Sequence, residues 1–179
     1  MAVTYVFPTK TGTISSMFGD ARDGGDRSHA GVDVAVPVGT PVRSMAGGEV
    51  VYTGYTSARG NYMKVQNNDG TLSLYQHLNG FDARVGDTVS PGQRIATSGN
   101  TGVGTGPHLH FELFENGSAI DPLSVNYYGA GSVAGIPSTL SGSVASVLPQ
   151  GLAGVGELLS QYWWAALIFI IGLALITKK

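Results

Sequence analysis

The segment from Gly106 to Phe114, GPHLHFELF, constrains the fold of this chain more than any other stretch. Its alternation is that of a β-strand with one apolar face, formed by Leu109, Phe111 and Leu113. The opposite face carries His108, His110, Glu112 and Phe114. Two imidazoles at this spacing can hold a metal ion together, or one can hold it while the other moves protons. Taken alone, the segment also fits a sheet edge with two solvated histidines.

The composition favours one all-β domain with an appendage. The chain has 179 residues, and its 27 glycines indicate many tight turns between short strands. Twelve acidic and ten basic residues give a net charge of -2, so no nucleic-acid partner is indicated. The absence of cysteine excludes disulfides and thiolate metal ligands.

Three successive strands are predicted in the middle of the chain, over residues 49–55, 62–66 and 71–78. The sequence Asn67-Asn68-Asp69-Gly70 between the last two is typical of a hairpin turn. In the third strand, Leu72 and Leu74 share one face while Tyr75 and His77 share the other. His77 is therefore expected to lie opposite an apolar face, as His108 and His110 do.

The carboxyl-terminal part of the chain has a different composition. Residues 129–156 are rich in Gly, Ser and Ala and carry no charge, which predicts a linker after a domain at residues 1–128. Residues 157–179 are predicted to form a transmembrane helix. Counted from Leu158 to Ile176 it would span roughly 28 Å, enough for a bilayer core. Aromatic residues at one end and Lys178 and Lys179 at the other resemble interfacial anchors.

All four histidines fall within the predicted β-domain, at His29, His77, His108 and His110. Asp33 follows His29 by four residues, so the two share a face if the segment is one extended strand, although a turn at Gly31 would change this. Together, imidazoles and one carboxylate would form a site suited to Zn²⁺ with a position left for water.

These residues resemble the lysostaphin-type zinc metallo-endopeptidases, which cut peptide bridges of bacterial peptidoglycan. The resemblance covers residues 7–123 and depends on three motifs in this order: HAGVDV from His29, YQHL around His77, and SGNTGVGTGPHLHFEL. It implies a small antiparallel β-sheet domain with a metal-binding groove. It also implies that His29, Asp33 and His110 bind zinc, and that His77 and His108 are catalytic.

The implied chemistry is metal-assisted hydrolysis of a peptide bond. Zinc on two neutral imidazoles and one carboxylate keeps a positive charge, so it can acidify water and polarise the scissile carbonyl. His108 and His77 would exchange protons with the water and the departing amine, in roles that the sequence does not divide. Glu112 could orient an imidazole or be structural, and Asn61 is a candidate for the substrate groove.

The predicted function is therefore hydrolysis of peptidoglycan cross-links, either glycine bridges or direct D-alanine to diamino-acid bonds. The lysines after the predicted helix would place the β-domain on the cell-wall side, yet the amino end does not resemble a secretory signal. We therefore expect a bacteriophage virion enzyme used in cell entry and anchored in a virion membrane, or otherwise in the bacterial inner membrane facing the periplasm. The alternative is a catalytically silent wall-binding or structural virion membrane protein. The oligomeric state is left open.

Overall fold

The predicted β-domain is built from short strands connected by tight turns. The computed structural model describes residues 4–128, 132–135 and 141–142. Their strands are β1 (Thr11–Ser16), β2 (Ala21–Arg22), β3 (Arg27–Ser28), β4 (Val32–Ala35), β5 (Pro41–Arg43), β6 (Gly48–Thr56), β7 (Gly60–Asn67), β8 (Leu72–Phe81), β9 (Thr88–Val89), β10 (Arg94–Ser98), β11 (His108–Glu115), β12 (Ser118–Ile120), β13 (Tyr127–Tyr128), β14 (Ser132–Ala134) and β15 (Ser141–Gly142). Two 3-10 turns, η1 (Asp23–Gly25) and η2 (Pro122–Ser124), complete the described secondary structure.

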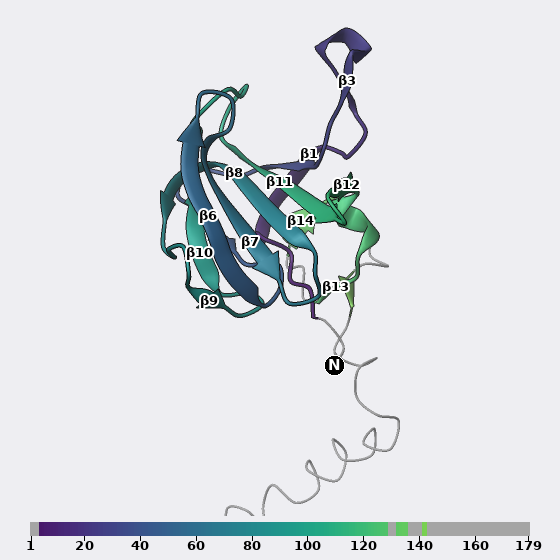
Figure 1. Cartoon of the computed structure of the whole chain (residues 1–179). Coiled ribbons are helices and arrows are strands. Elements are labelled where there is room, and N and C mark those ends of the chain that lie inside the picture. Colours follow the sequence, from purple (N-terminus) through teal and green to yellow (C-terminus); the bar gives the residue numbers. More distant parts are fainter. Residues whose placement is uncertain (1–3, 129–131, 136–140, 143–179) are drawn as a thin grey trace, which may run out of the picture. The chain divides into compact units, whose positions relative to one another are not determined.

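One large sheet contains most of these strands, in the order β14-β1-β4-β11-β8-β7-β6-β9. Its pairings are antiparallel except for that of β1 with β14, so the predicted fold class is confirmed for the described residues. The strand β11 lies between β4 and β8, in the middle of the sheet (Figure 1). The two histidines of β11 are therefore flanked by strands on both sides.

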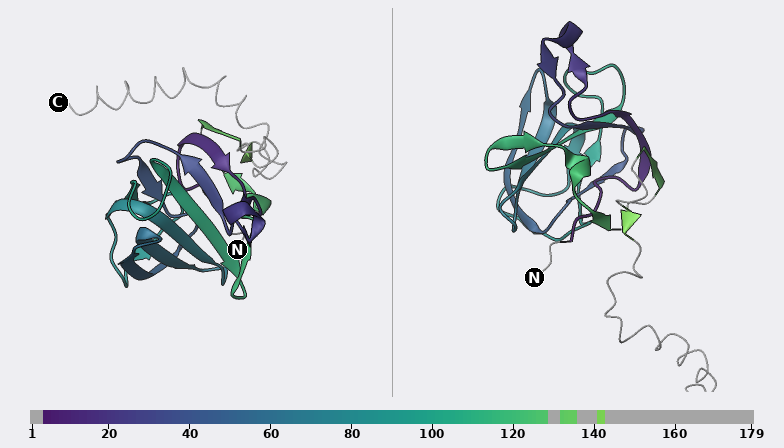
Figure 2. Two further views of the ribbon diagram at one scale, coloured as in Figure 1. Left: turned by 90° about the horizontal axis from the view of Figure 1, so that it is seen from above. Right: turned by 90° about the vertical axis from the view of Figure 1, so that its right-hand side faces the viewer.

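The alternation of β11 decides which face of the sheet is buried. Leu109, Phe111 and Leu113 are fully buried in the hydrophobic core, as the sequence predicts. Residues from the strands β4 to β10 and from the amino-terminal segment complete this core. The sheet is twisted and curved (Figure 2). The other face of β11 remains open for the histidines.

The faces of β8 differ from the prediction. Tyr75 packs in the core, where its hydroxyl oxygen accepts a hydrogen bond from the backbone N–H of Met45 at 2.9 Å. Leu72 and Leu74 lie on the opposite face, beside a surface pocket. His77 still reaches this opposite face because its backbone is left-handed, at φ 60°, inside a strand with irregular register. The expected position of His77 is thus reached through a bulge and not through regular alternation.

Two segments of the predicted linker form short strands among the described residues. Ser132–Ala134 pair with β1, and Ser141–Gly142 pair with β13. The predicted transmembrane helix at 157–179 lies outside the described residues. Within them, no helix is long and apolar enough to cross a membrane.

Candidate metal centre

The strand register brings Asp33 and His110 together. They are directly opposite each other on the antiparallel strands β4 and β11. Because directly opposed side chains on one face lie close together, their functional groups meet: His110 Nδ1 lies 2.7 Å from Asp33 Oδ1. This contact joins residues that are 77 positions apart in the sequence.

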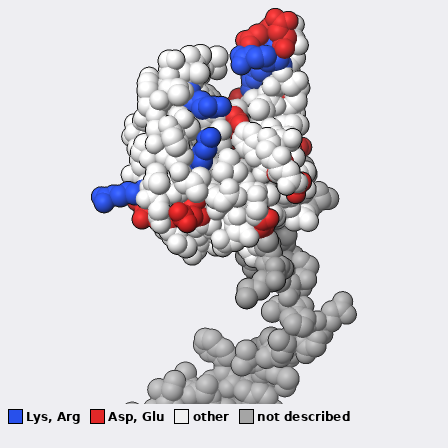
Figure 3. Space-filling model, viewed as in Figure 1, with Lys and Arg blue, Asp and Glu red and all other residues white. Residues whose placement is uncertain are grey.

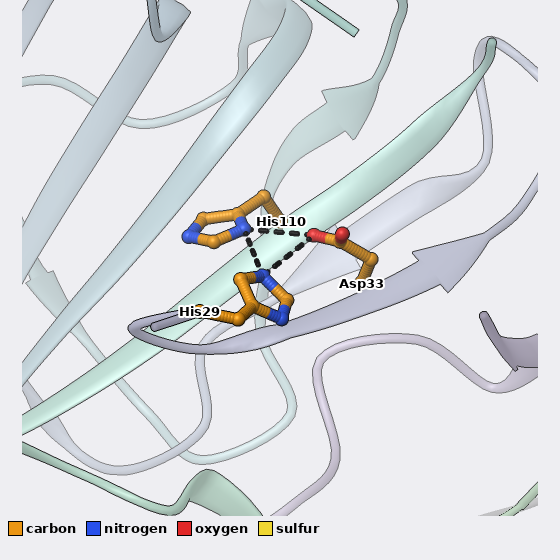
Figure 4. Close-up of side chains that lie close together, drawn as sticks. All are labelled: His29, Asp33 and His110. Carbon is orange, nitrogen blue, oxygen red and sulfur yellow. Dashed lines mark hydrogen bonds and ion pairs between the residues drawn. The ribbon is translucent and has the colours of Figure 1, made fainter. Parts of the chain in front are cut away.

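His29 joins this pair from the segment between β3 and β4. Its Nε2 lies 3.0 Å from His110 Nδ1 and 3.2 Å from Asp33 Oδ1 (Figure 4). His29 is not in one strand with Asp33, because the chain passes close to β11 at Gly31. A Cβ at Gly31 would lie 2.2 Å from the carbonyl oxygen of Phe111, so only glycine fits this approach.

The outer ring nitrogens of these histidines fix their neutral tautomers. His29 Nδ1 lies 2.8 Å from the carbonyl oxygen of Met17, which can only accept a hydrogen bond. His110 Nε2 lies 2.8 Å from Glu112 Oε1, which also accepts a hydrogen bond from Gln76 at 2.6 Å. Each neutral ring therefore donates outward and directs a lone pair toward Asp33 Oδ1.

Three acceptor atoms that face one another require a positive charge between them. Burial raises the pKa of Asp33, but hydrogen bonds with His110 and His29 outweigh burial and hold this pKa well below its usual range. Burial lowers the pKa of His110, whereas its hydrogen bonds to Asp33 and Glu112 raise it, and the net shift is upward. Both shifts favour a protonated His110 beside an ionised Asp33. The His, Asp, His donor set equally fits zinc.

The other two histidines lie beside this group, and one ring nitrogen of each faces a backbone carbonyl oxygen, as in His29. His77 Nδ1 lies 2.8 Å from the carbonyl oxygen of Thr101, and His108 Nδ1 lies 2.7 Å from that of Gly106. Both therefore leave Nε2 without a proton when neutral. Their ring centroids are 4.5 Å apart, and His108 Nε2 lies 3.9 Å from Asp33 Oδ1. Burial lowers the pKa of His77, so its neutral form persists into mildly acidic solution.

The two weaker candidates occupy supporting positions. Glu112 contacts His110 directly, as described above. Asn61 donates one side-chain hydrogen bond to the carbonyl oxygen of Leu78 at 3.1 Å, and its backbone N–H donates to Thr101 Oγ1 at 3.0 Å. Asn61 therefore helps to hold the loop that carries the partner of His77.

Sequence reasoning missed several residues that contact the group or its supporting residues, among them Ser16, whose Oγ lies 3.3 Å from His29 Nδ1. Arg22 Nη2 lies 2.7 Å from Asp33 Oδ2, which leaves Oδ1 for the histidines. Gln76 donates to Glu112. The position of Gln76 next to His77 in YQHL is a signal in the sequence, but no local pattern links Arg22 to Asp33.

Comparison with known proteins identifies relatives of the described unit. The model of Peptidase family M23 matches residues 27–122. The peptidoglycan DD-endopeptidase ShyA of Vibrio cholerae is 43% identical over 105 residues, which are 59% of this chain and 24% of that protein. The glycyl-glycine endopeptidase ALE-1 of Staphylococcus capitis is 44% identical over 102 residues, 54% of this chain and 28% of that protein. The chain thus spans about a quarter of the length of these relatives.

Solved structures share the fold. A zinc-containing peptidase from Vibrio cholerae matches with a TM-score of 0.58 and 31% identity, over 65% of this chain and 39% of that one. The catalytic domain of lysostaphin from Staphylococcus simulans matches with a TM-score of 0.56 and 37% identity, over 62% of this chain and 88% of that one.

Proposed function

The chain belongs to peptidase family M23, and from this premise we propose that it is a zinc-dependent endopeptidase that hydrolyses peptide cross-links of bacterial peptidoglycan. One observation carries the proposal: ligand atoms of His29, Asp33 and His110 lie within 4.8 Å of one another, beside two further histidines. The relatives named as peptidoglycan and glycyl-glycine endopeptidases support the substrate class.

His29, Asp33 and His110 would hold the zinc ion through Nε2, Oδ1 and Nδ1. When bound, zinc supplies Lewis acidity that acidifies water and polarises the scissile carbonyl. Met17 and Glu112 keep the two ligand imidazoles in the tautomers that coordinate a metal, because each accepts the outer N–H. Arg22 holds the second oxygen of Asp33.

His77 and His108 would move the protons of the reaction. Each neutral ring presents Nε2 as its acceptor nitrogen, so either can accept the proton released by the attacking water. The protonated ring can then donate to the amine that leaves when the peptide bond breaks. The contact between the two rings allows them to work as a pair.

The test measures zinc content and wall digestion with the same purified protein. We expect one zinc ion per chain and release of soluble peptides from purified peptidoglycan, with loss of digestion in His108→Ala although zinc remains bound. A zinc-loaded protein that leaves peptidoglycan intact, and is unchanged by His108→Ala, would instead indicate a wall-binding or structural protein. Mass spectrometry of the products identifies the cleaved bond.

We further propose that the chain is a bacteriophage virion protein anchored in a membrane by residues 157–179. The apolar tail followed by Lys178 and Lys179 supports the anchor. Fractionation of infected cells and purified particles tests the location: the proposal expects the protein in particles, with membrane association lost when the chain ends at residue 156. Presence in the envelope of uninfected bacteria and absence from particles would contradict it.

A further inference from the structure

A pocket of about 520 Å³ lies on the open face of the sheet, along β7, β8 and β11. Leu72, Leu74 and Phe114 form its apolar part. Arg59 and Lys64 also line it, whereas none of its described lining residues is acidic. In Figure 3, Lys and Arg atoms appear near the middle of the face shown, with a few Asp or Glu atoms beside the upper ones. The pocket therefore combines apolar surface with positive charge.

Aromatic rings hold both cations in place. The Arg59 guanidinium carbon lies 5.5 Å from the ring centroid of Tyr62, and Lys64 Nζ lies 5.9 Å from that of Tyr52. The two rings stack at 5.1 Å. A Cβ at Gly54 would lie 2.6 Å from the Tyr52 hydroxyl, so glycine lets this ring lie across β6.

Neither cation forms an ion pair within the described part of the chain, in contrast to Arg22, Arg27 and Arg94. Ring faces attract a cation but do not neutralise it. Arg59 and Lys64 therefore retain the capacity to bind a carboxylate.

The strand register connects the pocket to the histidines. Lys64 is opposite Leu74, and Leu74 is opposite Glu112, which contacts His110. Two strand spacings correspond to roughly 10 Å between the backbones of Lys64 and Glu112. The backbone carbonyl oxygen of Arg59 accepts a hydrogen bond from the backbone N–H of His77 at 2.9 Å. Because an extended peptide spans about 3.3–3.6 Å per residue, a few residues reach from the histidines to the pocket.

We propose that Arg59 and Lys64 bind a carboxylate of the peptide that is cleaved at the histidines. The preferred substrate is then a direct cross-link in which the residue before the cleaved D-alanine is a diamino acid with a free carboxylate at the far end of its side chain, since the interior of an oligoglycine bridge carries no charge. This inference rests on the proposed function and goes further by assigning the class of cross-link.

The experiment compares two synthetic cross-linked peptides with the same scissile D-alanine to diamino-acid bond. They differ only in whether the free side-chain carboxylate of the diamino acid that precedes the cleaved D-alanine is amidated; a pentaglycine peptide is a third substrate. For the full zinc-loaded chain we expect kcat/KM to be roughly tenfold higher for the free carboxylate, as for loss of one charge-assisted contact. This ratio should fall toward one at high salt, which screens the attraction.

Variants test the assignment to these two side chains. Arg59→Met and Lys64→Met should each lower the ratio of kcat/KM for the free peptide to that for the amidated peptide, mainly through a higher KM for the free peptide. Lys64→Arg keeps the charge and should largely keep the wild-type ratio. Arg84→Met removes an exposed cation that does not line the pocket, and its ratio should match the wild type. Circular dichroism and zinc content identify variants that fail to fold. If both variants fail to fold, the salt dependence of the wild-type ratio tests the proposal in their place.

Equal kcat/KM for the free and amidated peptides in the wild type would overturn this inference while leaving the endopeptidase function intact. If Arg84→Met loses the preference for the free carboxylate as much as the pocket variants do, the inference is also overturned, since the net charge of the protein would then explain the preference. If the wild type cleaves none of the three substrates, the proposed function itself fails.

Discussion

The four histidines of this chain are distinguished by the partners of their outer ring nitrogens. Three of them face backbone carbonyl oxygens, of Met17, Thr101 and Gly106. Only His110 faces a carboxylate, that of Glu112, among these described contacts. A carboxylate partner increases the basicity of an imidazole more than a carbonyl does. His110 is therefore the strongest imidazole donor of the proposed zinc site.

We expect Glu112→Gln to lower zinc affinity by about 10–100-fold, the usual effect of changing a residue that supports a metal ligand. The amide keeps the size of Glu112 but removes its charge, so His110 becomes a weaker donor. Competition with a chelator measures the affinity. Glu115→Gln, an exposed position on the same strand, is the matched control. Equal affinities of the two variants would show that the Glu112 contact does not support zinc binding.

We also expect zinc binding to release a proton from His110 in a pH-dependent manner. Burial lowers the pKa of His110, but hydrogen bonds to Asp33 and Glu112 outweigh burial and raise this pKa, so the metal-free protein keeps the proton to a higher pH than a free imidazole does. Zinc must displace it, and its apparent affinity should rise with pH until His110 is deprotonated without metal. Calorimetry in buffers of different ionisation enthalpy counts the protons. A count that stays constant from pH 6 to 9 would contradict this.

At the scale of elements, β11 and β8 place histidines by different means. Regular alternation in β11 separates its apolar residues from His108 and His110. In β8, Tyr75 takes the core position and the left-handed backbone at His77 turns that side chain to the open face. Such a conformation costs an L-residue about 1–2 kcal/mol. The bulge thus positions His77 at the expense of local backbone stability.

Glycine and alanine at position 77 should reverse their usual order of stability. Alanine normally stabilises a strand interior by about 0.5–1 kcal/mol over glycine. At φ 60° we expect His77→Gly to be more stable than His77→Ala by about 1 kcal/mol, because only alanine is strained. Urea denaturation measures the difference. At Asn79, where φ is negative or extended, the alanine variant should be more stable than the glycine variant, as is usual. If alanine is also the more stable residue at position 77, the left-handed backbone proposed there is wrong.

At the scale of the whole molecule, the proposed zinc site connects distant parts of the chain. His29 and His110 are 81 positions apart, and Asp33 lies on a third segment. An ion pair between Arg22 and Asp33 also links β2 to β4. A metal that binds only the folded protein stabilises the folded state, because the unfolded chain does not hold these ligands together.

Removal of zinc should therefore lower stability as well as activity. At a zinc concentration 100 times its dissociation constant, the expected stabilisation is about 2.7 kcal/mol. Thermal unfolding with and without a chelator measures it, and added zinc should restore both stability and wall digestion. In His110→Ala the melting temperature should not respond to zinc. A wild type whose melting temperature is also unresponsive would argue against a zinc site at these residues.

Much of the fold could be predicted from local patterns. The alternation in β11, the hairpin turn after Asn67 and the many glycines gave the all-β class, since each depends on residues a few positions apart. The metallopeptidase family was predicted from three ordered motifs and is confirmed by the family match. The membrane anchor and the virion location stay predictions.

The sequence by itself determined which residue types were available, namely four histidines and one aspartate near motifs typical of a peptidase. Only the tertiary structure decided how they meet. The register of β4 on β11 pairs Asp33 with His110, the close approach at Gly31 brings in His29, and the bulge turns His77. Arg22 and the cations of the pocket likewise acquire their roles across strands. Such contacts depend on long-range register, which no short sequence window contains.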